Sequence, residues 1–233
     1  MPINNFLLPG AKFIPAFNID NSCRFNLGDS PQLSKSVGSS ATTKYTLSLW
    51  VKRGDITTAA GQRFLTSTGG GGLGDVYFRF NPSDIIELST VGDDSGHLIT
   101  NRKFRDPNAW MHLCLRYDST ESTATDRFRL YINGVDERSV GGYSTSTMPT
   151  SSEADNIVAS GNTIYVGQSG ASAQYCGMYM AEYHFSEGQS YAPTEFGEYN
   201  EDSPTIWQPK KADISYGTSG FYLDFEDSAN LGN

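Results

Sequence analysis

The chain has 233 residues, and its 26 acidic and 17 basic side chains give a formal net charge of −9 at pH 7. Only 18% of the residues are charged while 12% are aromatic, and glycine is frequent, a composition that favours strands and turns and predicts an all-β soluble protein. The excess of negative charge repels phosphate backbones and anionic lipid headgroups, so nucleic acid and membrane surfaces are excluded as expected partners.

The first clear strand pattern lies at residues 45–51, where apolar and polar side chains alternate. This period of two predicts a core strand with one apolar face. Residues 76–80 and 85–89 have similar patterns on either side of the turn signal at residues 81–84. We therefore expect these two segments to pair as a hairpin.

Residues 110–117 carry apolar side chains on both faces, which indicates an inner strand. Residues 127–132 alternate again and are followed by Asn133 and Gly134. This dipeptide supplies the two positive φ angles of a type I′ turn, so a hairpin is expected there.

Three further segments have strand patterns: residues 163–167, 177–185 and 221–225. The stretches between strands are rich in glycine, serine and threonine, and we interpret three of them as loops: residues 28–43, 119–125 and 141–159. No segment has an apolar stripe at a period of 3.6 residues, so helix should be scarce.

The negative charge is concentrated in the last quarter of the chain. Residues 182–233 contain 10 acidic and 2 basic side chains, a net charge of −8, whereas residues 1–181 contain 16 and 15, a net charge of −1. Three prolines and an isolated Trp207 also fall after residue 186. This pattern predicts an extended acidic arm that lies on the domain or on a neighbouring chain.

Cys23, Cys114 and Cys176 are odd in number and widely spaced. An odd set argues against a disulfide framework, and a zinc site would need closer cysteine and histidine ligands. We expect three structural thiols in a reducing compartment. The start of the chain has no basic segment followed by an apolar run, so no export signal is predicted.

The order of the strands resembles the laminin-G-like branch of the concanavalin A-like jelly rolls. The similarity is carried by residues 45–51, 110–112, 130–134, 165–167 and 177–185, and it covers about residues 40–200. It implies an all-β fold, an antiparallel two-sheet jelly-roll sandwich with extended terminal arms.

The resemblance divides the chain into three regions. Residues 1–40 are expected to form an N-terminal arm with the first strand or strands, residues 41–185 the laminin-G-like jelly roll, and residues 186–233 the acidic, proline-spaced C-terminal arm. We expect the natural chain to continue beyond Asn233. Glu182 stands where the family usually has an aspartate in the segment that ends the domain.

The flanking segments at residues 5–10, 49–53, 192–196 and 220–225 are similar to virion proteins of tailed bacteriophages. The resemblance implies a tail fibre, spike or capsid decoration, assembled in the host cytoplasm and located on the virion. Its expected role is host-surface attachment or particle assembly. The expected partners are other virion proteins, a bacterial surface glycan and further copies of the chain in a trimer.

Sugar recognition uses flat aromatic faces together with polar side chains that fix the hydroxyl groups. Four tyrosines in or beside the glycine- and serine-rich segments are candidates for such contacts: Tyr143, Tyr175, Tyr179 and Tyr191. Half-buried packing in strands is the alternative role for each of them.

Calcium is the metal that jelly rolls of this type often hold among loop oxygens, and it prefers carboxylate and carbonyl ligands. Candidate ligands are Asp75, beside a run of glycines, and Asp93 and Asp94, which precede Ser95 in one loop. A solvated acidic turn is the alternative interpretation. No other cofactor is expected.

An enzyme of this architecture would need two carboxylates in one cleft, about 5–5.5 Å apart in a retaining glycosidase. Residues 181–185 offer only Glu182, and Asp224 and Glu226 have the required alternate spacing but lie in the weakly patterned tail. His112 lies within a strand pattern and is interpreted as a packed residue. We therefore expect a protein that is not an enzyme, with a polysaccharide depolymerase or glycosidase as the alternative.

Overall fold

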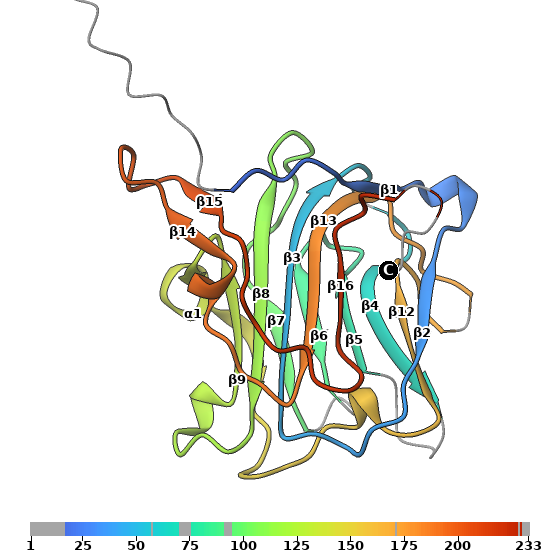
Figure 1. Cartoon of the computed structure of the whole chain (residues 1–233), viewed down its shortest axis with the longest axis vertical. Helices are drawn as coiled ribbons and strands as arrows, with labels where there is room; N and C mark the ends of the chain where they lie inside the picture. Colours follow the sequence, from blue (N-terminus) through green and yellow to red (C-terminus); the bar gives the residue numbers. More distant parts are fainter. Residues whose placement is uncertain are drawn as a thin grey trace, which may run out of the picture.

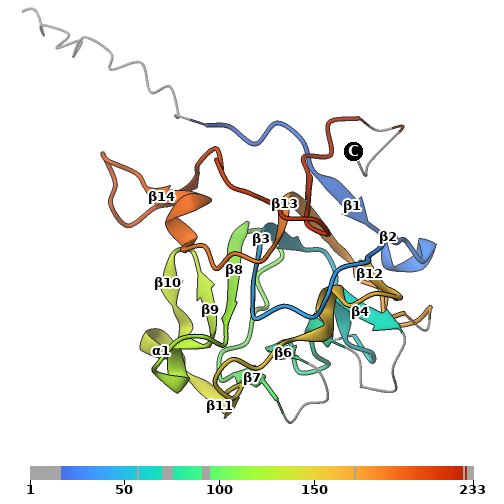
Figure 2. The same cartoon turned by 60° about the horizontal axis from the view of Figure 1, so that its bottom comes forward.

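The protein is a sandwich of two antiparallel β-sheets, seen in a computed structural model that describes residues 17–56, 58–69, 76–90, 95–170, 172–227 and 229. Figures 1 and 2 show the sheets lying face to face. Within the described residues each large sheet has seven strands. The predicted all-β jelly-roll sandwich is therefore confirmed.

The first sheet, called sheet A here, has this spatial order: β1 (Cys23–Phe25), β13 (Met178–Glu187), β3 (Lys44–Arg53), β8 (Met111–Asp118), β9 (Phe128–Ile132) and β10 (Val135–Asp136). β16 (Phe221–Leu223) pairs with the second half of β13, on the same side as β1. Sheet B has this order: β11 (Tyr143–Thr147), β7 (His97–Thr100), β6 (Ile86–Ser89), β5 (Val76–Phe80), β4 (Gln62–Gly69), β12 (Asn162–Val166) and β2 (Leu33–Ser36). A separate small sheet pairs β14 (Gly197–Tyr199) with β15 (Trp207–Pro209).

Helix is scarce, as predicted. The described helices are α1 (Glu137–Val140) and four 3-10 turns: η1 (Leu27–Asp29), η2 (Ala124–Asp126), η3 (Asn156–Val158) and η4 (Pro193–Glu195). None of these helices has the length and apolar character needed to cross a membrane.

One hydrophobic core fills the space between the sheets. β3 and β8 supply its centre, where the rings of Tyr45 and Tyr117 stack with centroids 4.8 Å apart. These are the apolar faces that alternation predicted for both strands. β8 pairs with β3 on one side and β9 on the other, so its inner position is confirmed.

The predicted hairpins are also present. β5 and β6 pair directly across the expected turn. Asn133 and Gly134 have φ angles of 50° and 78° between β9 and β10, the conformation of a type I′ turn.

Two segments predicted as loops contain strands. β2 falls within residues 28–43 and β11 within residues 141–159. Both are edge strands of sheet B with few buried side chains, so their sequences carry little apolar alternation. β4 also escaped prediction, because its buried polar side chains are interspersed with apolar ones and the alternation is lost.

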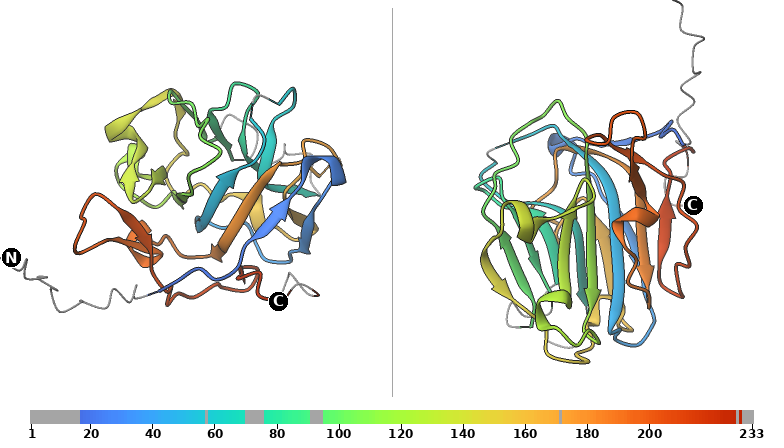
Figure 3. Two further views of the ribbon diagram at one scale, coloured as in Figure 1. Left: turned by 90° about the horizontal axis from the view of Figure 1, so that it is seen from above. Right: turned by 90° about the vertical axis from the view of Figure 1, so that its left-hand side faces the viewer.

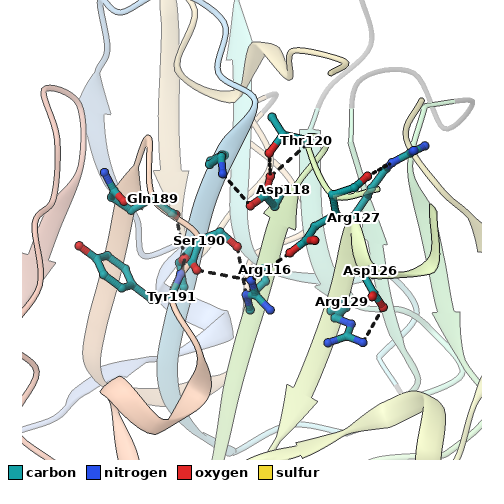
Figure 4. A network of polar contacts seen from close by, with 12 residues as sticks. Arg116, Asp118, Thr120, Asp126, Arg127, Arg129, Gln189, Ser190 and Tyr191 are labelled. Carbon is teal, nitrogen blue, oxygen red and sulfur yellow. Dashed lines mark hydrogen bonds and ion pairs between the residues drawn. The ribbon is translucent and has the colours of Figure 1, made fainter. Parts of the chain in front are cut away.

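The C-terminal arm, here residues 186–227, leaves the end of β13 and crosses the outer face of sheet A, the face turned away from sheet B, before β16 joins the edge of the sheet (Figure 3). Thr46 of β3 donates its hydroxyl to the carbonyl of Gln189 (3.0 Å) and accepts the backbone N–H of Tyr191 (2.8 Å). Arg116 of β8 donates to the Ser190 hydroxyl at 3.0 Å, as Figure 4 shows. The arm was predicted to lie on the domain or on a neighbouring chain, and in the structure it contacts its own domain.

Candidate functional site

A bulge in β13 turns Glu182 to the outer face of sheet A. The pairing of β13 with β3 shifts register between Ala181 and His184, and Glu182 adopts a positive φ of 46°. A non-glycine residue in this conformation is uncommon, and such positions gather at functional sites. Bulges likewise re-aim side chains near binding sites. The backbone geometry therefore directs attention to Glu182.

Two aromatic rings contact the Glu182 carboxylate, and a third contacts one of these rings. Tyr222 of β16 donates its hydroxyl to Glu182 Oε2 at 2.8 Å, and its ring stacks on His184 with centroids 4.3 Å apart. His184 Nε2 lies 3.5 Å from the same carboxylate oxygen, and His184 Nδ1 lies 2.8 Å from the hydroxyl of Tyr216. These contacts fix the carboxylate while one side of it borders an open cavity.

Burial and charge shift the pKa values of these groups. Burial raises the pKa of Tyr222, and the neighbouring Glu182 carboxylate adds to this shift. Burial also lowers the pKa of His184 below its usual range, against the opposing effect of Glu182. The tyrosine hydroxyl is thus a hydrogen-bond donor and the imidazole is neutral at pH 7.

The cavity beside Glu182 has a volume of about 200 Å³ and a polar lining. Its walls come from the N-terminal segment, β13, β16 and the residues that follow β16: Phe17, Asn18, Asp20, Asn21, Glu182, Tyr222, Asp224 and Glu226. Four of these side chains are carboxylates and two are amides, and neither lysine nor arginine is among them. We call this cavity the acidic half.

A second cavity of about 400 Å³ continues along the same face and has an apolar lining. Its lining residues are Ile19, Asp20, Asn21, Ser22, Trp50, Trp110, Ala181 and Pro209. We call it the aromatic half, because it contains two indole rings, of which Trp110 is 38% exposed. Asp20 and Asn21 border both cavities, and we call the two cavities together the β13 groove.

The C-terminal arm packs beside the aromatic half and supplies Pro209 to its lining. Trp207 of β15 packs with Trp50 and Ala181 in a cluster separate from the main core. His112 of β8 lies between the two indoles, with its ring centroid 5.3 Å from Trp50 and 5.9 Å from Trp207. His112 is thus a packed strand residue, as the sequence indicated.

The four tyrosines predicted as sugar contacts lie at separate places. Tyr143 is in edge strand β11 of sheet B, Tyr175 precedes β13, and Tyr191 is part of the arm and packs against Phe196. Tyr179 of β13 is the one that lies at the groove, because its ring meets Trp110 edge-on at 6.5 Å. Whether any of them binds sugar stays a prediction.

The predicted calcium ligands Asp75, Asp93 and Asp94 lie outside the described residues. Among the described residues, no group of three or more histidine, cysteine, aspartate or glutamate side chains is arranged to hold a metal ion. The three cysteines are free thiols, with Cys114 and Cys176 buried and Cys23 partly exposed.

The carboxylates Glu182, Asp224 and Glu226 were candidates from the sequence, but the sequence did not show that they line one cavity. The lining residues from Phe17 to Asn21, which have no strand pattern, and the contribution of Tyr222 were not predicted. The alternation of Tyr222, Asp224 and Glu226 was a usable signal, since alternate residues of an extended chain point the same way.

The fold and the groove define a β-sandwich with a mixed aromatic and polar site on one face. The chain belongs to the concanavalin A-like lectin/glucanases superfamily, whose family model matches residues 27–187. No curated protein matches the chain.

Solved structures are similar to this chain at low sequence identity. The native heptameric SAP-like pentraxin of Limulus polyphemus is 12% identical with a TM-score of 0.51, over 75% of this chain and 80% of the pentraxin. Domain 4 of AbnA, a GH43 extracellular arabinanase from Geobacillus stearothermophilus solved with arabinotriose, is 16% identical with a TM-score of 0.46, over 77% and 76%. The botulinum neurotoxin serotype D binding domain is 12% identical with a TM-score of 0.48, over 79% of this chain and 46% of that one.

Proposed function

We propose that this chain is a carbohydrate-binding protein that uses the β13 groove as its binding site. The observation that carries the proposal is the junction of an aromatic half with an acidic half through Asp20 and Asn21. Exposed indole faces pack against the C–H faces of sugar rings, while carboxylates and amides accept and donate hydrogen bonds to hydroxyl groups. A groove that offers both in sequence suits an extended saccharide.

The biological setting that we propose is a phage virion, on which the domain serves as a tail fibre, spike or capsid decoration for host-surface attachment. The resemblance of the flanking segments to virion proteins supports this setting. Immunogold labelling of purified particles tests it. We expect gold particles at a defined position on the virion. Virions without label would contradict the proposed phage setting.

Binding is tested by applying the whole chain to an array of bacterial surface polysaccharides. The variants Glu182→Gln and Trp110→Ala each change one half of the groove, and Glu201→Gln changes an exposed carboxylate elsewhere as the control. We expect both groove variants to lose at least tenfold in affinity for the bound glycan and the control to match the wild-type chain. Equal binding by all four proteins would contradict the proposal.

Glycoside hydrolysis is a second candidate, favoured by the presence of Glu182, Asp224 and Glu226 in one cavity. Two carboxylates that flank a glycosidic bond can act as acid and as base or nucleophile. The glycan bound on the array is incubated with the protein, and reducing ends are measured. Release that disappears in Glu182→Gln favours an enzyme, whereas tight binding without release favours a lectin-like protein.

A further inference from the structure

Three side chains form a row across sheet A beside the aromatic half of the groove. Arg24 of β1 is the register partner of Tyr179 of β13, and Tyr179 is in turn the partner of Lys52 of β3. Residues directly opposite one another on adjacent strands point to the same side of a sheet. The neighbours of Tyr179 in β13, Met178 and Met180, face the core, so the row lies on the outer face.

The two cations flank one aromatic ring. Arg24 Cζ lies 5.8 Å and Lys52 Nζ 5.9 Å from the centroid of the Tyr179 ring. Their strands lie on opposite sides of β13, which places the two backbones about 10 Å apart. An anionic group above the ring would be within reach of both side chains.

Neither cation has a carboxylate partner within the part of the chain that the structure describes. Arg24 is exposed and Lys52 is half-buried. Asp55 borders a small cavity together with Arg24 and Tyr179, but its carboxyl group packs against the backbone of Gly177. The paired cations therefore remain open to an external anion.

The row is continuous with the groove. The Tyr179 ring meets Trp110 edge-on, and Trp110 lines the aromatic half. On the other side of this half lies the acidic cavity with Glu182. Along the outer face of β13 the surface therefore passes from basic through aromatic to acidic.

We propose that Arg24 and Lys52 form a subsite for an oxyanion substituent of the saccharide, a carboxylate, sulfate or phosphate group. This inference rests on the proposed carbohydrate-binding function and extends it to the class of ligand. The sugar ring that carries the oxyanion lies near Tyr179 and Trp110, and the uncharged remainder of the saccharide extends toward Glu182. The acidic half repels a second anionic group, so the site selects both the charge and its position on the ligand.

The test compares singly charged probes with uncharged derivatives of the same saccharides. A neutral oligosaccharide that ends in one uronate is compared with its methyl ester, and an oligosaccharide with one terminal sulfate or phosphate is compared with its unsubstituted parent, by titration calorimetry at low and high salt. The proteins are the wild-type chain, the double variant Arg24→Gln/Lys52→Gln and the control Lys103→Gln/Lys211→Gln, which removes two exposed cations elsewhere. Thermal unfolding confirms that each protein is folded.

We expect the wild-type chain to bind the charged member of at least one pair roughly five- to tenfold more tightly at low salt, with the preference reduced at high salt. The double variant should bind both members within about twofold, while the control keeps the preference. The pair of probes for which the wild-type chain prefers the charged member identifies the kind of oxyanion that is bound. Equal or absent binding of charged probes by the wild-type chain and the double variant would overturn the subsite.

The outcome also separates the subsite from the groove. Neutral probes that bind in a manner sensitive to Trp110→Ala, with no charge preference, would retain the groove and overturn the subsite. Charged probes that depend on Arg24 and Lys52 but are indifferent to Trp110→Ala and Glu182→Gln would retain the subsite and overturn the groove.

Discussion

The indole N–H of Trp207 donates a hydrogen bond to Nδ1 of His112 at 3.1 Å, joining the C-terminal arm to the centre of sheet A. Because indole is only a donor, Nδ1 must accept, and the neutral imidazole carries its proton on Nε2. That proton is donated to the hydroxyl of Ser48, 2.8 Å away. One buried histidine thus links the arm to two strands.

Trp207→Phe should destabilise the protein. The substitution leaves His112 Nδ1 buried without a donor, which costs about 1–3 kcal/mol in the free energy of unfolding. Urea unfolding measures the change, with Ile206→Ala as the control because the neighbouring Ile206 is 56% exposed. The control should stay within about 0.5 kcal/mol of the wild-type protein. A Trp207→Phe variant as stable as the control would contradict this role of the hydrogen bond.

Acid should destabilise the fold through His112. Burial, aided by the nearby His184, lowers the pKa of His112 to about 3, whereas an unfolded histidine has a pKa of about 6.5. Between these two pKa values, His112 binds a proton in the unfolded state but not in the native state. This contribution to stability is complete above pH 6.5 and is lost as the pH falls toward 3, by roughly 4–5 kcal/mol.

The variant His112→Gln cannot take up this proton. The slope of its unfolding free energy against pH should therefore be smaller than that of the wild-type protein between pH 6.5 and 3, whatever its absolute stability. Urea titrations at a series of pH values give both slopes. Identical slopes would show that His112 is protonated in the native protein.

Asp155 should act in the opposite direction. Burial raises its pKa to about 7, although the Tyr45 hydroxyl and the Ile157 amide donate hydrogen bonds to it at 2.9 Å. An unfolded aspartate has a pKa near 3.9, so the native state holds the extra proton between these values. Its contribution is fully present below pH 3.9 and is lost as the pH rises through 7, by roughly 4 kcal/mol.

Asp155→Asn keeps an oxygen for the Ile157 amide and removes the ionisation. The wild-type protein should lose stability relative to this variant as the pH is raised from 4 to 8, and the same unfolding titrations measure it. A constant difference between the two proteins across this range would be inconsistent with a raised pKa at Asp155. The pH dependences of the unfolding free energy that His112 and Asp155 cause have opposite signs and partly cancel in the wild-type protein. Each variant removes one of the two contributions and so makes the other measurable.

Because of the bulge, glycine and alanine variants at position 182 should differ in stability in an unusual direction. At a φ of 46° a Cβ atom is strained, so Glu182→Gly should be about 1 kcal/mol more stable than Glu182→Ala, the reverse of the order inside an ordinary strand. Both variants lose the carboxylate equally. Thermal unfolding compares them, and an alanine variant that is the more stable of the two would show that the bulge relaxes.

The fold was predictable wherever large apolar side chains recur at every second position of a strand. β3, β8 and β9 have this pattern because every second side chain of each faces the common core. β4 lacks the pattern, because polar side chains such as Gln62 and Thr66 are buried in it and find hydrogen-bond partners there. β2 and β11 lie at sheet edges and need few apolar residues.

The groove was less predictable than the sandwich. Glu182 and Tyr222 are separated by forty positions in the sequence, and only the pairing of β13 with β16 brings them together. The positive φ of Glu182 coincides with a register shift between β13 and β3, which involves residues far apart in the sequence. Likewise, the row formed by Arg24, Tyr179 and Lys52 depends on which strands are neighbours, and local patterns do not encode this.

Nuclear magnetic resonance mapping of a bound saccharide tests the central claim most directly. The array identifies a glycan, and the labelled whole chain is titrated with it while backbone amide and indole signals are followed. We predict that the largest shifts fall on the β13 groove, at Asp20, Asn21, Ala181 and the Trp110 indole. Shifts confined to sheet B around Tyr143, with an unchanged groove, would contradict the assignment of the binding site.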